Sequence, residues 1–157
     1  MESKEKSFES GLQPLRVGID LVEVGKIRKL FEGGNPLRES IFTPEELHYS
    51  WEQKNPYTSL AVLFAVKEAL FKALGTGLNG KMDWRDVEIR KGTEGTPVLH
   101  LCGETARAAE ELGVIDYAFS LSHTKEYGIA IVLLVAIALQ KPLGKVGPIL
   151  GQSTNLL

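Results

Sequence analysis

Residues 59–77 read SLAVLFAVKEALFKALGTG and carry the longest helical pattern in the chain. Its large apolar side chains recur at the spacing of one helix face, at Leu60, Leu63, Phe64, Phe71 and Leu74. Gly75 and Gly77 follow, and glycine is common where a helix ends. This stretch therefore predicts a long helix packed against a core.

Shorter patterns surround this helix. Strands are predicted at residues 15–21, 84–90, 96–101, 117–122 and 128–135. A helix with one apolar face is predicted at 24–31, and another at 105–112. Thr43-Pro44-Glu45-Glu46 has the cap, proline and acidic residues of a helix start. The mixture predicts an α+β fold.

Composition limits the class of protein. The 157 residues are 43% hydrophobic and 24% charged, which fits one globular domain. We expect a flexible leader at 1–13, a domain at 14–138 and an irregular tail at 139–157. A net charge of −2 gives no case for nucleic-acid binding. The longest apolar run, 129–139, is short of the roughly 20 residues that span a bilayer. No signal-peptide pattern is present, so we expect a cytoplasmic protein without membrane contact.

Three features could carry chemistry. Asp20 ends an apolar strand pattern, where it could cap the next helix or bind a cation. Lys67 interrupts the apolar face of the long helix, while Glu68 and Lys72 have the spacing of a surface ion pair. His123 follows a strand among hydroxyls and a lysine, which suits either an anion site or a solvated turn. Each feature alone leaves both interpretations open.

Taken in order, the blocks resemble the signatures of holo-acyl-carrier-protein synthases, which are 4′-phosphopantetheinyl transferases. The matching blocks are residues 18–23 (GIDLVE), 64–69 (FAVKEA), 72–77 (KALGTG) and 120–123 (SLSH). Residues 42–46 and 84–89 are also similar, so the resemblance runs from about 16 to 135. It implies a single small domain in which an antiparallel sheet packs on a long helix.

The resemblance also implies a reaction. The 4′-phosphopantetheine arm of coenzyme A would move to a serine of an apo carrier protein, with Mg²⁺ present and 3′,5′-ADP released. This would serve fatty-acid or polyketide synthesis. Asp20 and Glu68 would bind Mg²⁺, and Lys72 would stabilise charge on the pyrophosphate. The remaining residues implied near the cofactor are Lys67, Gly75, Thr76, Gly77 and His123. The group that accepts the serine proton stays open among Glu68, a metal-bound water and a nearby aspartate.

Partners follow from the same resemblance. An acidic carrier protein would dock on Lys26, Arg28 and Lys29 of the first helix, and three copies would form a homotrimer with active sites between subunits. Two departures stand out. Many relatives have arginine where this chain has Leu63, and arginine where it has Lys26. Two rival functions are a protein that binds coenzyme A or a carrier without turnover, and a generic Mg²⁺-dependent nucleotide enzyme.

Overall fold

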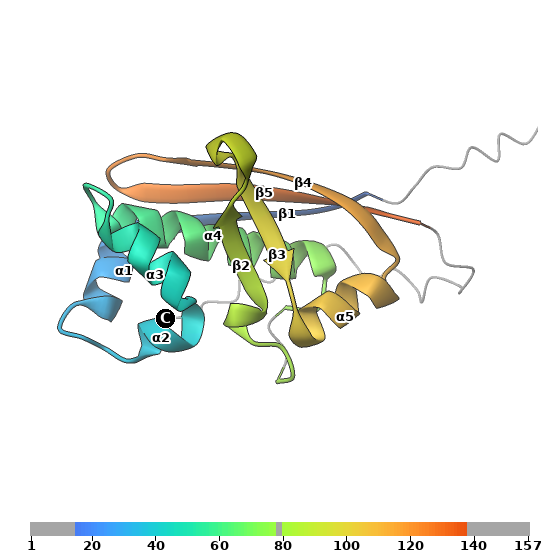
Figure 1. Ribbon diagram of the computed structural model, residues 1–157, viewed down its shortest axis with the longest axis horizontal. Coiled ribbons are helices and arrows are strands. Elements are labelled where there is room, and N and C mark those ends of the chain that lie inside the picture. The colour runs from blue at the N-terminus through green and yellow to red at the C-terminus, as the bar shows by residue number, and fades with distance from the viewer. Residues whose placement is uncertain (1–14, 78–79, 138–157) are drawn as a thin grey trace, which may run out of the picture.

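The computed structural model describes residues 15–77 and 80–137 (Figure 1). The predicted leader at 1–13 and tail at 139–157 lie outside these residues, and the domain limits stay predictions. A sheet forms one layer, a long helix packs beneath it, and a hairpin and shorter helices cover the other side of that helix. No helix in the described ranges is long and apolar enough to cross a membrane.

The main sheet has three antiparallel strands in the order β1-β5-β4: β1 (Leu15–Glu23), β5 (Tyr127–Ala136) and β4 (Val114–His123). Asp20 of β1 lies opposite Ala130 of β5, which in turn lies opposite Leu121 of β4. Side chains alternate between the two faces of a strand. Gly18 and Val22 of β1 are buried on the side of the long helix, as are Ala130, Val132 and Leu134 of β5.

The long helix is α4 (Pro56–Leu74). The predicted helix is confirmed, but it begins three residues earlier than residue 59. The Asn55 side chain accepts a hydrogen bond from the Thr58 amide, and Pro56 occupies the first turn, where no amide donor is needed. Gly75 ends α4 in the left-handed conformation, at φ 76°. Most of α4 is buried because elements pack on opposite sides of it.

The other elements complete this packing. They are α1 (Val24–Phe31), α2 (Leu37–Ile41), α3 (Pro44–Trp51), η1 (Trp84–Asp86), β2 (Val87–Lys91), η2 (Thr93–Gly95), β3 (Pro97–Leu101) and α5 (Gly103–Glu111). Strands β2 and β3 form a separate antiparallel pair. The predicted start of α3 is confirmed: the Thr43 side chain accepts from the Glu46 amide, and the Glu46 carboxylate accepts from the Thr43 amide.

The strand predicted at 84–90 is partly wrong. Residues 84–86 form the 3-10 turn η1, and β2 begins only at Val87. Asp83 accepts from the Arg85 amide at 2.8 Å, and Asp86 accepts from the Asp83 amide at 3.3 Å. These side-chain bonds favour a turn over an extended strand. Helix α2 was not predicted, because its five residues are too few to display a period.

The outer face of the sheet is apolar. Leu15, Val17, Ile19 and Leu21 of β1 are each more than half exposed. Tyr127 and Ile129 of β5 are also exposed. An exposed apolar surface of this kind marks a candidate interaction face.

Candidate active site

Asp20 lies on the side of β1 that faces α4, and its side chain is 16% exposed. Lys72, in the last turn of α4, places its Nζ 2.7 Å from Asp20 Oδ1 and donates to the Ile19 carbonyl at 3.1 Å. Asp20 does not cap α1, because Glu23 occupies that position and makes no side-chain cap bond. Its carboxylate therefore pairs with the helix that carries Glu68.

Glu68 lies one turn before Lys72 on α4 and is half-buried. Burial raises the pKa of its carboxyl above the ordinary value, and the charge of Asp20 raises it further, while Lys72 opposes the rise. Two carboxylates that disfavour each other's charge have a reason to share a cation. The structure thus brings Asp20, Glu68 and Lys72 together, from segments about fifty residues apart in sequence.

The donor set fits Mg²⁺ better than a softer metal. Asp20 and Glu68 offer only hard oxygen ligands, and Mg²⁺ is commonly held by one or two carboxylates together with substrate phosphates and water. Within residues 15–77 and 80–137, no group of three or more histidine, cysteine, aspartate or glutamate side chains is placed to hold a metal. Two carboxylates fill only part of an octahedral Mg²⁺ shell, so a metal bound by Asp20 and Glu68 would keep coordination positions for a substrate.

This geometry predicts a pH-dependent stability. Because the pKa of Glu68 is raised in the folded protein, its contribution to stability is present below its ordinary pKa and is lost as the pH rises through the raised pKa. We expect Glu68→Gln to raise the melting temperature of the metal-free protein by a few degrees at most at pH 8, and to give no gain at pH 4. Differential scanning calorimetry at both pH values would check this. The prediction would be contradicted if the melting temperatures of Glu68→Gln and the wild type differed by the same amount at pH 4 and at pH 8.

Gly18 allows β1 to approach α4 closely. A Cβ atom at Gly18 would lie 1.8 Å from the Ala69 carbonyl oxygen and 2.7 Å from the Ala73 amide nitrogen. Only glycine fits such a contact without moving the strand. Since Asp20 is two residues further along β1, this contact sets the distance between Asp20 and α4.

The C-terminal end of α4 is held by a residue that the sequence analysis did not predict. Arg16 of β1 donates to the carbonyls of Ala73 and Leu74, at 2.7 and 2.8 Å. A Cβ at Gly75 would lie 2.4 Å from the Arg16 guanidinium. Thr76 and Gly77 are exposed beyond this anchor. One feature of the sequence could have revealed Arg16: it is a polar residue spaced by two from Gly18, and by four from Asp20, so all three lie on the same face of β1.

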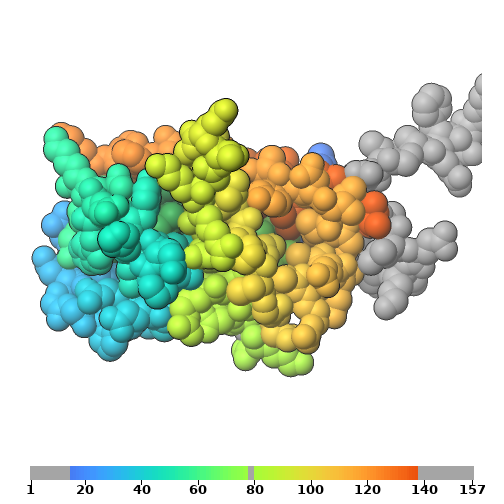
Figure 2. Space-filling view, viewed as in Figure 1, coloured from blue at the N-terminus to red at the C-terminus, as the bar shows by residue number. Residues whose placement is uncertain are grey.

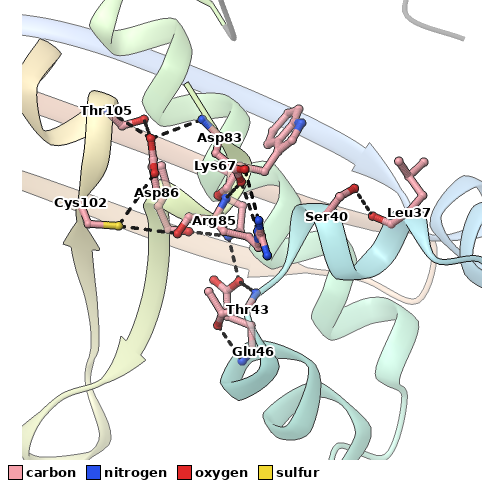
Figure 3. Close-up of polar contacts among 12 residues, drawn as sticks. Leu37, Ser40, Thr43, Glu46, Lys67, Asp83, Arg85, Asp86, Cys102 and Thr105 are labelled. Carbon is pink, nitrogen blue, oxygen red and sulfur yellow. Dashed lines mark hydrogen bonds and ion pairs between the residues drawn. The ribbon is translucent and has the colours of Figure 1, made fainter. Parts of the chain in front are cut away.

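Lys67 is not brought to this surface. Its side chain is fully buried, and Nζ lies 2.8 Å from Glu46 Oε2 and donates to the carbonyls of Trp84, at 3.1 Å, and Val87 (Figure 3). Burial lowers the pKa of Lys67, and Glu46 opposes this effect. The sequence analysis predicts that Lys67 contacts cofactor phosphates. In the structure its donors instead face the interior.

His123 lies apart from the other predicted residues. It ends β4, whereas Asp20 is on β1, and β5 separates these two edge strands. His123 lines a cleft of about 1440 Å³ together with Leu63 of α4 and Leu121 of β4. In Figure 2 the surface is hollowed between α3 and the β2–β3 hairpin, which both contribute to this cleft.

The cleft is basic although the chain is slightly acidic. Among the described residues, five basic side chains and one acidic side chain line it: Arg28, Lys54, Arg90, Lys91, Lys125 and Glu45. Leu63 is 5% exposed and adds no charge to the cleft. Positive charge gathered in a cleft attracts anions more strongly than the net charge of the protein suggests.

The three basic residues predicted on α1 have different environments. Lys26 forms an exposed ion pair with Glu23 at 3.6 Å, and Lys29 is exposed. Arg28 stacks over the Tyr57 ring, 4.7 Å from its centroid, and also lines the cleft. Arg28 therefore connects the exposed face of α1 with the basic cleft.

Comparison with known proteins identifies the class that this fold and site define. The family model described as the 4′-phosphopantetheinyl transferase superfamily matches residues 16–132. The chain belongs to this superfamily. A curated holo-[acyl-carrier-protein] synthase of Carboxydothermus hydrogenoformans is 43% identical over 118 residues, which cover 74% of this chain and 94% of that protein.

Solved structures agree. The holo-[acyl-carrier-protein] synthase of Neisseria meningitidis matches with a TM-score of 0.68 and 31% identity, covering 76% of this chain and 96% of that one. The synthase of Helicobacter pylori, solved in complex with coenzyme A, matches with a TM-score of 0.65 and 27% identity over 75% of this chain and 98% of its own. Within its superfamily, the chain is a member of the holo-acyl-carrier-protein synthases, and the α+β fold expected from the sequence is confirmed.

Proposed function

We propose that the protein transfers 4′-phosphopantetheine from coenzyme A to a serine hydroxyl of an acidic apo acyl carrier protein in a Mg²⁺-dependent reaction. The observation that carries this proposal is the convergence of Asp20, Glu68 and Lys72 from β1 and α4. We further propose that the carrier belongs to cytoplasmic fatty-acid or polyketide synthesis.

In this reaction the serine hydroxyl gives up its proton to a base, and its oxygen forms a bond to the phosphorus that bears pantetheine. The bond from that phosphorus to the bridging oxygen of the pyrophosphate breaks, and 3′,5′-ADP leaves. Asp20 and Glu68 would hold Mg²⁺, which supplies positive charge to the phosphate oxygens. Lys72 adds a second positive charge beside Asp20, and such charge stabilisation is the main requirement of phosphoryl transfer.

The basic cleft supports the choice of substrate. Coenzyme A carries a 3′-phosphate besides its pyrophosphate. The cleft offers positive charge that could bind this additional phosphate, because its basic residues are separate from Asp20. Arg28 of α1 lines the same cleft, so an acidic carrier docked on α1 would place its serine near the bound cofactor.

Mass spectrometry tests the proposal directly. Incubating the protein with coenzyme A, Mg²⁺ and an apo carrier should add the mass of one phosphopantetheine group to the carrier. The group should not transfer to a carrier whose acceptor serine is replaced with alanine, nor in the presence of excess EDTA. If several wild-type carriers gained no mass although the protein bound coenzyme A, the proposal would be wrong.

The separation of His123 from Asp20 supports a site shared between subunits. The two residues lie on opposite edge strands of one chain, and the apolar outer face of β1 and β5 is available for another copy. We therefore propose a homotrimer in which His123 of one subunit completes the Asp20–Glu68–Lys72 site of its neighbour.

Mixing two inactive variants would check the shared site. We expect Glu68→Gln and His123→Ala each to lose most transfer activity alone. Unfolded and refolded together in equal amounts, they should regain about a quarter of the wild-type sites, because that fraction of random interfaces joins two intact halves. A mixture no more active than its separate components would place both residues in one subunit's site.

A further inference from the structure

One buried charge plays no part in the proposed chemistry. Lys67 lies next to Glu68 in α4 and is 0% exposed. An ammonium group has three donors. Those of Lys67 meet three acceptors: the Glu46 carboxylate, the Trp84 carbonyl and the Val87 carbonyl. Because every donor is used inside the protein, Lys67 is arranged to hold other parts of the structure.

The partner of Lys67 is equally occupied. Glu46 is also fully buried, and its Oε2 accepts from the Thr43 amide at 3.0 Å while its Oε1 accepts from the Ile89 amide at 3.0 Å. The Lys67–Glu46 pair thus connects α4 to the first turn of α3 and to β2 (Figure 3). Three elements meet at one ion pair.

The pair constrains how α4 is turned about its axis. Neighbouring residues of a helix project about 100° apart, since one turn contains 3.6 residues. Fixing Lys67 toward Glu46 therefore fixes the direction of Glu68. Polar contacts of Arg16 and Lys72 also hold α4, but they join its last turn to β1. Lys67, the neighbour of Glu68, instead ties the helix to α3 and β2. A buried ion pair has strict geometric demands and often gives specificity rather than net stability.

We propose that Lys67 is a positioning residue: its bond to Glu46 sets the rotation of α4 so that Glu68 faces Asp20 and both carboxylates meet one cation. This inference rests on the proposed metal-dependent transfer. It replaces the expectation that Lys67 contacts the phosphates of coenzyme A.

Two binding measurements test the inference without relying on turnover. Electron paramagnetic resonance would give the affinity for Mn²⁺ without nucleotide, and calorimetry would give the affinity for 3′,5′-ADP without metal. Both would be done at a temperature where circular dichroism shows every variant folded. For Lys67→Met we expect Mn²⁺ affinity to fall by roughly tenfold or more, as for partners that orient metal ligands, with 3′,5′-ADP affinity unchanged. If 3′,5′-ADP binding weakened and Mn²⁺ binding did not, Lys67 would be a phosphate ligand and the inference would fail.

Matched variants separate positioning from general destabilisation. Leu99→Ala, in β3, should lower thermal stability but leave Mn²⁺ affinity unchanged. A similar loss of Mn²⁺ affinity in Leu99→Ala would overturn the inference. If Lys67→Met does not fold, Glu46→Gln gives a second test, because it removes the charge that holds Lys67 and should weaken Mn²⁺ in the same way. If the wild-type protein bound Mn²⁺ but modified no carrier, the proposed function would be wrong. The Mn²⁺ affinities of the variants could still be compared with that of the wild type, so the inference about Lys67 would still be tested.

Discussion

Replacement of Glu68 with glutamine is expected to lower phosphopantetheine transfer by about 1,000-fold or more. Glutamine keeps the size of the side chain but removes one of the two charges that would hold Mg²⁺ beside Lys72. Losing several kcal/mol of charge stabilisation corresponds to a rate change of that size. The initial rate of carrier modification at increasing Mg²⁺ would be measured, and high Mg²⁺ should restore part of the rate.

Glu110→Gln is a suitable control, since this exposed carboxylate lies on α5, away from the site. Its rate and its Mg²⁺ dependence should equal those of the wild type. If Glu68→Gln behaved like this control, the two-carboxylate site would not be the centre of catalysis. Activity and stability should respond differently to Glu68→Gln. The variant should lose activity while its metal-free form is no less stable than the wild type at neutral pH, and a folding defect cannot produce this combination.

The elements with a long period or a strong boundary could be predicted from the sequence. The apolar spacing of α4 and the Thr43 capping box depend on contacts within a few residues, which a sequence displays directly. The strand predicted at 84–90 was wrong over its first three residues for the same local reason, because side-chain bonds of Asp83 and Asp86 compete with extended backbone.

The candidate site could be predicted only in part from the sequence. The meeting of Asp20 with Lys72 depends on the packing of β1 against α4, and the resemblance to a family supplied it where spacing could not. The burial of Lys67 was not predicted, because the carboxylate of its partner, Glu46, is also accounted for by a helix cap. One carboxylate serves both purposes, and nothing in sequence spacing reveals a second role. The position of His123 depends on strand order, since β5 lies between β1 and β4.

Replacement of Gly18 with alanine is expected to damage both the fold and the site. The added Cβ would overlap the Ala69 carbonyl, so β1 must move away from α4. Forced repacking of this kind typically costs about 1–3 kcal/mol of the free energy of unfolding, and we expect the upper end here because the overlap is with backbone. Because Asp20 moves with the strand, a displacement of about 1 Å should also lower transfer by roughly 100-fold where the variant is still folded.

Calorimetry and the rate of carrier modification at low temperature would measure the two effects of Gly18→Ala separately. Gly25→Ala is the matched control, because a Cβ at Gly25 in α1 meets nothing within 4 Å, and alanine favours a helix. That variant should be as stable as the wild type or slightly more so. Weak Mn²⁺ binding in folded Gly18→Ala would trace its lost activity to a displaced Asp20, whereas normal Mn²⁺ binding and a normal rate would mean that β1 absorbs the methyl group without moving the carboxylate.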